Sequence, residues 1–287
     1  MPFGTRAIEG TREELPEPVV ELFVPLTDLG DPLFFVVLAA VVYWLGDHDR
    51  GAYFVGAMLL VLGLTVGLKE LFALPRPPAE LHLVAETGYG LPSGHAAGAV
   101  VVYGGLAALY DRGPRALRYA VAAIVVALVS ASRVVLGVHY VADVLAGLAL
   151  GVAVLALAVG LRERQRERVP PVFYAGGAIG AIVGAALSGL RYESSLLVLG
   201  GTVGALVWWI LLAPAPAAPR RMTALLGAVV LPIVVWLVYL GMTALEGPLV
   251  LVAVTAVAIT LVLATPHAAA RLASIAERRH PGVATDR

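Results

Sequence analysis

The sequence contains no cysteine and a single lysine, and charged residues make up only 14% of its 287 residues. Without cysteine the chain can form neither disulfides nor thiolate metal sites, and its redox compartment is not indicated. A soluble protein of this length would carry about 25% charged residues. The first 29 residues hold several glutamates and lack the basic start and apolar centre of a cleavable signal peptide. The low share of charged residues argues against a soluble globular chain.

Long apolar segments fill most of the chain, and hydrophobic residues make up 60% of it. A membrane-crossing helix needs about 20 mostly apolar residues. The sequence therefore predicts an all-α fold, a polytopic transmembrane helical bundle of about nine spans. The first span is short, so it crosses tilted or in a thinned region, or does not fully cross. The expected spans are 32–45, 52–68, 93–110, 119–132, 139–161, 172–190, 196–213, 223–242 and 249–264.

Polar stretches divide the chain into regions. The clearest boundary is the run of arginines and glutamates at 162–168, which is followed by two prolines. Glycines four residues apart favour close helix packing in membranes; they are Gly147 and Gly151, and Gly176, Gly180 and Gly184. The predicted regions are a polar interfacial arm (1–30), a five-span core (31–162), a four-span region of unknown role (170–265) and a polar cytoplasmic tail (266–287).

The basic residues are distributed unequally between the two predicted sides. Alternating spans place 14 of the 20 lysines and arginines on the side of the C-terminal tail. Arginine-rich loops face the cytoplasm in membrane proteins. We therefore expect a multi-pass cell-membrane protein with a cytoplasmic C-terminus, and with the helix ends near residues 69, 93 and 139 facing outward.

Three polar clusters lie at or near the ends of apolar segments on this outward side. Ionisable groups at membrane depth are costly and usually mark a functional site. The polar loop 72–92 between the first two clusters also carries His82 and Glu86, which we expect to be solvated. The clusters are Lys69 with Arg76-Pro77; Pro92-Ser93-Gly94-His95; and Ser132-Arg133 followed by His139 and Asp143.

Residues of these types suit a phosphate group. Arg76 and Arg133 each offer a planar fork that matches two phosphate oxygens, and Lys69 adds a compact charge. Ser93 stands at the N-cap position of a predicted helix, whose free backbone donors form an anion seat. Gly94 lets the backbone approach an anion closely.

The two histidines suit phosphoryl transfer in two steps. His139 and Asp143 are four residues apart on one helix, so the carboxylate can fix the tautomer of the imidazole. A histidine held in this way can attack phosphorus and form a phospho-histidine. His95, at another helix start, is then free to protonate the leaving oxygen and later to activate water.

Each residue also has a structural interpretation when it is taken alone. Lys69 could extend along the helix to the interface, and Arg133 could set topology. His139 and Asp143 could form a buried structural pair, and Ser93 could be only an N-cap. The joint occurrence of all these residues at fixed spacings favours a site.

Taken together, the three clusters resemble the full signature of the type 2 phosphatidic acid phosphatase (lipid phosphate phosphatase) superfamily. The resemblance covers roughly residues 30–162 and implies a metal-independent, cofactor-free membrane phosphatase. It implies that His139 is the nucleophile, Asp143 its orienting partner and His95 the general acid. It further implies phosphate ligation by Lys69, Arg76, Ser93, Gly94 and Arg133.

The resulting hypothesis is an integral membrane lipid phosphatase that hydrolyses a lipid phosphate monoester or diphosphate through a phospho-histidine at the outer surface. Polyprenyl diphosphate, phosphatidic acid and other lipid phosphates fit the same residues. Alternatives are a phosphotransferase to an alcohol and a lipid transporter with a phosphate-binding site. The expected partners are the lipid substrate and the bilayer, with no nucleic acid. The last four spans could supply a homodimer face, a lipid channel or a partner site.

Overall fold

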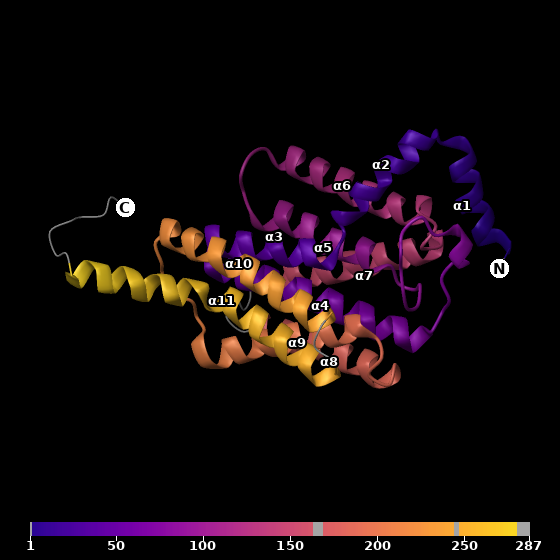
Figure 1. The fold of residues 1–287 in the computed structure, drawn as a ribbon. Coiled ribbons are helices and arrows are strands. Elements are labelled where there is room, and N and C mark those ends of the chain that lie inside the picture. The colour runs from indigo at the N-terminus through magenta and orange to yellow at the C-terminus, as the bar shows by residue number, and fades with distance from the viewer. Residues whose placement is uncertain (1, 163–168, 244–246, 280–287) are drawn as a thin grey trace.

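The computed structural model describes residues 2–162, 169–243 and 247–279, without the side chains of residues 2–4, 7 and 12. These residues form eleven α-helices and one short 3₁₀ helix, η1 (Figure 1). The predicted all-α fold is confirmed for the described residues. The helices are α1 (Pro2–Glu14), α2 (Glu17–Asp28), α3 (Pro32–Leu45), α4 (His48–Phe72), α5 (Gly94–Leu109), α6 (Arg115–Val135), α7 (Val141–Leu161), α8 (Val169–Leu187), α9 (Glu193–Leu212), α10 (Arg220–Thr243) and α11 (Pro248–Arg279), and η1 covers Ala79–Leu81.

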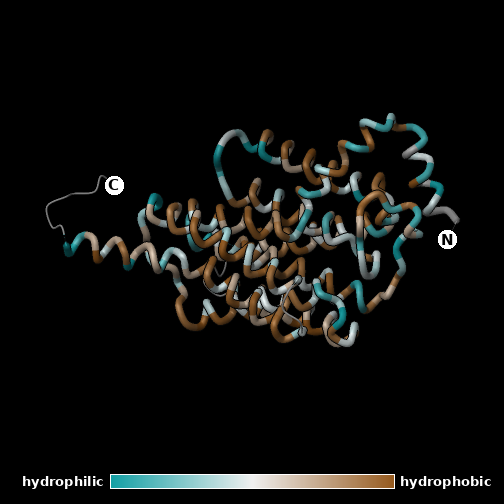
Figure 2. Tube along the Cα trace, viewed as in Figure 1, coloured by the Kyte–Doolittle hydropathy of each residue, from teal (hydrophilic) through white to brown (hydrophobic). Residues whose placement is uncertain are grey.

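The long apolar helices identify a multi-pass membrane protein. In the described part of the chain, seven helices are long and apolar enough to cross a membrane, namely α4 and α6 to α11. The pair α2 and α3, bent by 51° at a short break, gives an eighth span if it crosses as one. Hydrophobic residues line the helices and hydrophilic ones gather towards their ends (Figure 2). The expected count of nine is not confirmed, because α3 and α5 are too short to qualify alone.

Helix α4 forms the centre of the bundle. It packs against α3, α5, α7, α8 and α9, so most of its length is buried inside the protein. Asp47 caps its first turn, with its carboxylate accepting a hydrogen bond from the Arg50 amide at 2.9 Å. Its last turn ends at Ala73, whose backbone is left-handed (φ 48°). The helix is therefore longer at both ends than the predicted span 52–68, and its last turn carries Lys69 of the first polar cluster.

Small residues allow close approach between helices, as predicted. A Cβ atom on Gly63 of α4 would lie 2.1 Å from the carbonyl oxygen of Gly177 on α8. A Cβ on Gly180 would lie 2.4 Å from the Gly63 oxygen. Backbone contact of this kind is typical of glycine-mediated packing between membrane helices. It joins the predicted core to the C-terminal four-span region.

Aromatic donors make a second connection between these regions. The Tyr43 hydroxyl and the Trp44 ring, both on α3, donate to the carbonyls of Leu263 and Val262 on α11, at 3.0 and 2.8 Å. A buried donor without a partner would cost free energy, so these bonds fix α3 against α11. The C-terminal helices therefore pack on the core along several faces.

Two predicted boundaries differ from the structure or lie outside it. Helix α11 continues through Pro266 to Arg279 instead of ending near 264, because the following residues are mostly good helix formers. Of the predicted boundary cluster 162–168, residues 163–168 lie outside the described residues, as do residues 280–287 of the predicted tail.

Candidate active site

Four helix ends meet at one end of the bundle. The C-terminal ends of α4 and α6 lie beside the N-terminal ends of α5 and α7, and the loop 73–92 runs over them (Figure 1). The predicted site residues come from these four ends and from the loop. The structure brings them together into one cluster, which the following contacts define.

A tight backbone turn places His139 next to Arg133. Helix α6 ends at Val135, and Gly137 follows with a left-handed backbone (φ 73°). The chain then folds back, and the amides of Val138 and His139 both donate to the Arg133 carbonyl at 3.2 Å. A side chain at position 137 would disfavour this conformation.

Both ring nitrogens of His139 have partners. Nδ1 lies 3.3 Å from Oδ2 of Asp143, and Nε2 lies 3.0 Å from Nη1 of Arg76. A guanidinium can only donate, so Nε2 is the acceptor and Nδ1 carries the proton. The same Asp143 oxygen accepts the Tyr140 amide at 2.9 Å, which holds the carboxylate in place. The lone pair of Nε2 therefore points towards Arg76, as an attack on a phosphate held there would require.

The environment of His139 favours the neutral ring. The residue is buried, with 1% exposure. Burial lowers the pKa of His139 well below its ordinary value, and the nearby charges of Lys69, Arg76 and Arg133 lower it further. A neutral imidazole is the form that can act as a nucleophile.

The start of α5 is fixed against the start of α7. Ser93 is the N-cap, as predicted, and its hydroxyl accepts from the Ala96 amide at 3.4 Å. Its own amide donates to the Asp143 carbonyl at 2.9 Å. A Cβ on Gly147 of α7 would lie 2.4 Å from the Ser93 carbonyl oxygen. These contacts hold the N-terminus of α5, which begins at Gly94, beside Asp143, the partner of His139.

His95 lies in the first turn of α5, under the turn that joins α2 and α3. A Cβ on Gly30 of that turn would lie 2.9 Å from the His95 ring. The charges of Arg133, Lys69 and Arg76 all act on this ring. The same three cations therefore act on His95 and on His139, although His95 belongs to α5 and His139 to the turn before α7.

Lys69 is buried in the last turn of α4, with 4% exposure. Its ammonium donates to the Tyr89 carbonyl at 2.6 Å and approaches the Gly90 carbonyl at 3.5 Å. The side chain thus points into the cluster instead of extending to the interface, which favours the site interpretation over the structural one. The charge lies under the loop segment that leads into α5.

Arg76 organises the loop 73–92. Its Nε donates to the carbonyls of Thr87 and Gly88 at 3.2 and 3.1 Å, and Nη1 donates to the Val138 carbonyl at 2.9 Å. These bonds fold the loop back on itself and fix the guanidinium beside His139. Nη2 additionally pairs with Oε2 of Glu86 at 3.0 Å.

Arg133 contacts two residues that lie outside the three predicted clusters. Its Nη1 donates to the Thr27 hydroxyl of α2 at 2.5 Å, and its Nη2 pairs with Oε1 of Glu86. Thr27 is buried, so α2 covers the cluster, whereas the sequence predicted only an interfacial arm. No spacing or motif in the sequence connects Thr27 with a residue 106 positions away.

The expectation of a solvated Glu86 is wrong. Its side chain is only 21% exposed and bridges Arg76 and Arg133. His82 is also engaged, with Nε2 at 3.0 Å from the Pro77 carbonyl of its own loop. The two residues appeared alike in the sequence, and the folding of the loop separates them.

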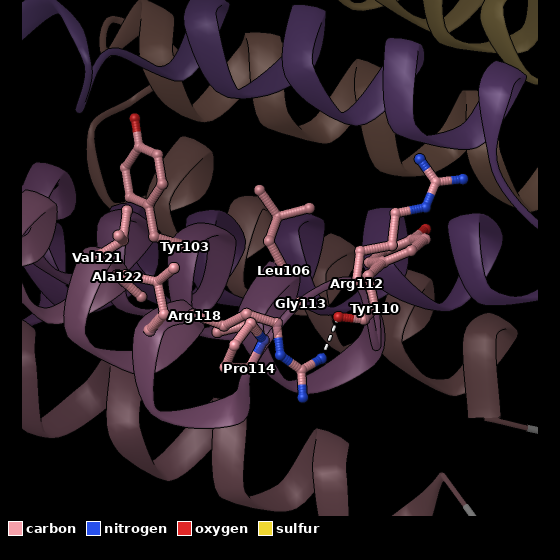
Figure 3. Close-up of a pocket in the computed structure, with 11 residues that line it drawn as sticks. Tyr103, Leu106, Tyr110, Arg112, Gly113, Pro114, Arg118, Val121 and Ala122 are labelled. Carbon is pink, nitrogen blue, oxygen red and sulfur yellow. Dashed lines mark hydrogen bonds between the residues drawn. The ribbon is translucent and has the colours of Figure 1, made fainter.

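A cavity of about 360 Å³ lies at the other end of α5, between α5 and α6 (Figure 3). Its lining includes Tyr103, Leu106, Leu117 and Arg118, and Arg118 donates to the Tyr110 carbonyl. None of the predicted site residues lines it. The cavity is therefore separate from the cluster around His139.

Fold and site together define a multi-pass helical membrane protein with two histidines and three basic side chains gathered at one bundle end. The family model of the PAP2 superfamily matches residues 50–167. Phosphatidylglycerophosphatase B of Bacillus subtilis is 31% identical over 181 residues, which are 57% of this chain and 89% of that protein. The chain belongs to the PAP2 superfamily, a family that includes lipid phosphatases.

Two further similarities extend this comparison. Sphingosine-1-phosphate phosphatase 1 of Rattus norvegicus is 29% identical over 147 residues, which are 49% of this chain and 34% of that protein. The crystal structure of a transmembrane PAP2 type phosphatidylglycerolphosphate phosphatase from Bacillus subtilis shares 30% identity, with a TM-score of 0.47. The matched region covers 55% of this chain and 83% of the chain in that crystal structure.

Proposed function

We propose that this protein is a membrane-bound lipid phosphate phosphatase that works through a phospho-histidine on His139. The observation that carries the proposal is the pairing of His139, with Nδ1 on Asp143 and Nε2 towards Arg76. This arrangement leaves one nitrogen lone pair directed at a group that would bind phosphate. Relatives named as phosphatidylglycerophosphatase and sphingosine-1-phosphate phosphatase support a lipid phosphate as the substrate.

In the first step, Nε2 of His139 forms a bond to phosphorus while the bond from phosphorus to the lipid oxygen breaks. His95 donates a proton to that oxygen. The charges on a bound phosphate offset the cations that act on His95, and this favours its protonated ring. In the second step, His95 takes a proton from water, the water oxygen bonds to phosphorus, and Nε2 leaves.

The remaining polar groups of the site hold the phosphate. Arg76 and Arg133 supply planar forks, and Lys69 supplies a further charge near the loop carbonyls. The free amides at the start of α5, capped by Ser93 and beginning at Gly94, supply neutral donors for the developing charge. These interactions need no metal ion or cofactor.

We place this site on the extracytoplasmic surface and the C-terminal end of α11 on the cytoplasmic side. The ends of α4 and α6 and the starts of α5 and α7 share one bundle end. The connections at the opposite end carry most of the arginines, which favours a cytoplasmic position for that end. An outward site would act on lipid phosphates or diphosphates of the outer leaflet, such as a polyprenyl diphosphate or a phosphatidic-acid-like lipid.

The test is phosphate release by the purified full-length protein in detergent from a panel of lipid phosphates, with and without a chelator. His139→Ala should lower the rate at least about 10³-fold, because it removes the nucleophile itself. The matched control is His267→Ala, whose ring lies against the Leu212 carbonyl at the far end of the molecule. Full activity of His139→Ala would refute the mechanism.

A further experiment distinguishes hydrolysis of the phospho-histidine from transfer of its phosphoryl group to an alcohol. A candidate acceptor alcohol is added to the same reactions, and the products are analysed for a phosphorylated alcohol. Free phosphate as the sole product supports the phosphatase. A phosphorylated alcohol as the main product would replace it with a phosphotransferase that uses the same His139 intermediate.

A further inference from the structure

Glu86 lies between the two arginines of the cluster. Its Oε2 pairs with Nη2 of Arg76 at 3.0 Å, and its Oε1 pairs with Nη2 of Arg133. One carboxylate thus uses one oxygen for each guanidinium. A phosphate held by the same two arginines would present two oxygens in the same manner.

The burial of the three side chains places Glu86 on the outer side of this arrangement. The side chains of Arg133 and Arg76 are 1% and 8% exposed, and that of Glu86 is 21% exposed. Glu86 also belongs to the loop 73–92 rather than to a helix. Its carboxylate can therefore turn towards solvent by a rotation of its own side chain. Arg133 then keeps its bond to Thr27, and Arg76 keeps its bond to the Val138 carbonyl.

We propose that Glu86 is a specificity-determining residue that occupies the phosphate position of the free enzyme and is displaced by the substrate. The proposal rests on the proposed function, because it assumes that Arg76 and Arg133 bind phosphate. Within that function it assigns a role to a residue outside the three predicted clusters.

Because a ligand has to displace Glu86, its charge alone does not determine how tightly it binds. Inorganic phosphate has to break both ion pairs of Glu86 before it can bind the two arginines, and it places no chain in the bilayer. A lipid phosphate additionally places its chains in the bilayer, and this apolar contribution offsets the cost of displacement. Glu86 therefore keeps free phosphate, the reaction product, from occupying the site, and it returns when the product leaves.

A structural role makes a different prediction. If Glu86 only neutralised the two arginines and stayed in place with substrate bound, its loss would destabilise the protein. Glu86→Asp, which keeps the negative charge, would then bind phosphate as the wild type does. The affinity of the site for a small anion therefore distinguishes the two roles.

The experiment measures the inhibition constant of inorganic phosphate for the full-length protein in detergent, together with the rise in melting temperature that phosphate causes. For Glu86→Gln, the inhibition constant should fall about tenfold, since a competing charge is removed from the arginine pair. The melting temperature should rise more steeply with phosphate than in the wild type, because tighter binding stabilises the folded state more. The matched control is Glu80→Gln, an exposed acid of the same loop, which should leave both measurements unchanged.

Glu86→Asp serves as a second variant if Glu86→Gln does not fold. Its shorter side chain cannot reach both arginines equally, so phosphate should bind more tightly than to the wild type, by a smaller factor. Unchanged or weaker phosphate affinity in the folded variant would overturn the proposal.

Failure of the proposed function would look different. If the wild type releases no phosphate from any lipid of the panel while Glu86→Gln still raises the phosphate-induced melting shift, the displacement proposal stands and the phosphatase proposal fails. If the wild type is active and Glu86→Gln leaves phosphate affinity unchanged, only the displacement proposal fails.

Discussion

The chemical state of His139 depends on its burial and on the three basic side chains around it. The ring is 1% exposed, and both burial and the charges of Lys69 and Arg76 lower its pKa below the ordinary value. In the unfolded chain a histidine titrates near pH 6.5. Folding therefore holds His139 neutral in a pH range in which the unfolded chain takes up a proton.

This difference predicts how stability depends on pH. The contribution of neutral His139 is fully present above about pH 6.5 and is lost as the pH falls below it, because the unfolded state then binds the additional proton. The melting temperature in detergent should thus fall between pH 7 and pH 5. His139→Gln, which has no titrating ring, should show a smaller fall.

The control for this prediction is His82→Gln. The His82 ring bonds to its own loop at the Pro77 carbonyl and does not lie among the three cations. This variant should keep the pH dependence of the wild type. An equally steep fall in wild type and His139→Gln would show that other groups set the acid sensitivity.

For single residues, the sequence predicted which side chains lie together in the cluster. It did not predict the contacts that depend on how the loop 73–92 folds. The spacing from His139 to Asp143 predicted that their side chains would meet, and the measured contact agrees with it. The prediction that both lie on one helix is wrong, because α7 begins at Val141 and His139 lies in the turn before it. Glu86 has no periodic relation to a helix. Its position depends on the hydrogen bonds from Arg76 to the carbonyls of Thr87 and Gly88, and no pattern in the sequence predicts these bonds.

At the scale of helices, the contact between α5 and α7 determines the geometry of the site. Gly147 and Gly151 of α7 face the carbonyls of Ser93 and Ala97 on α5, and a Cβ on either glycine would lie 2.4 or 2.6 Å from them. The Ser93 amide also donates to the Asp143 carbonyl. The N-terminus of α5 and Asp143, the partner of His139, are therefore held together as one unit.

Gly147→Ala tests this unit. The added methyl group should push the start of α5 away from α7, misplace the amides after Ser93 and lower phosphatase activity by about tenfold or more, since small misplacements at a catalytic centre are costly. Phosphate release by the purified variant measures the effect. Gly160→Ala is the matched control on the same helix, because nothing lies within 4 Å of its Cβ position.

The control variant should retain full activity, since alanine also favours the helical conformation over glycine. Equal activity of both variants would mean that the close contact at Gly147 has no influence on the site. The sequence predicted this glycine as a packing residue, although it could not indicate that its partner is the backbone of Ser93.

At the scale of the whole molecule, the C-terminal helices are part of the structure that supports the site. Helix α8 packs closely along α4, which carries Lys69. In the turn before α9, the Tyr192 ring lies so close to Gly88 that a Cβ there would be 2.8 Å from it. The family signature predicts the core but says nothing about these helices. Their contacts with the core are glycine packing and hydrogen bonds from aromatic side chains to backbone carbonyls, which leave no motif of fixed spacing.

The proposed orientation of the molecule rests on the distribution of its charges, and the absence of cysteine makes it directly testable. Ala79 lies in η1 beside the site, and Ala217 lies in the connection between α9 and α10 at the arginine-rich end; both are exposed. Each is replaced by cysteine in the full-length protein, and intact cells are treated with a membrane-impermeant maleimide. Positive loops stay in the cytoplasm, so Ala79→Cys should react in intact cells and Ala217→Cys only after permeabilisation. The reverse pattern would place the site in the cytoplasm and exclude substrates of the outer leaflet.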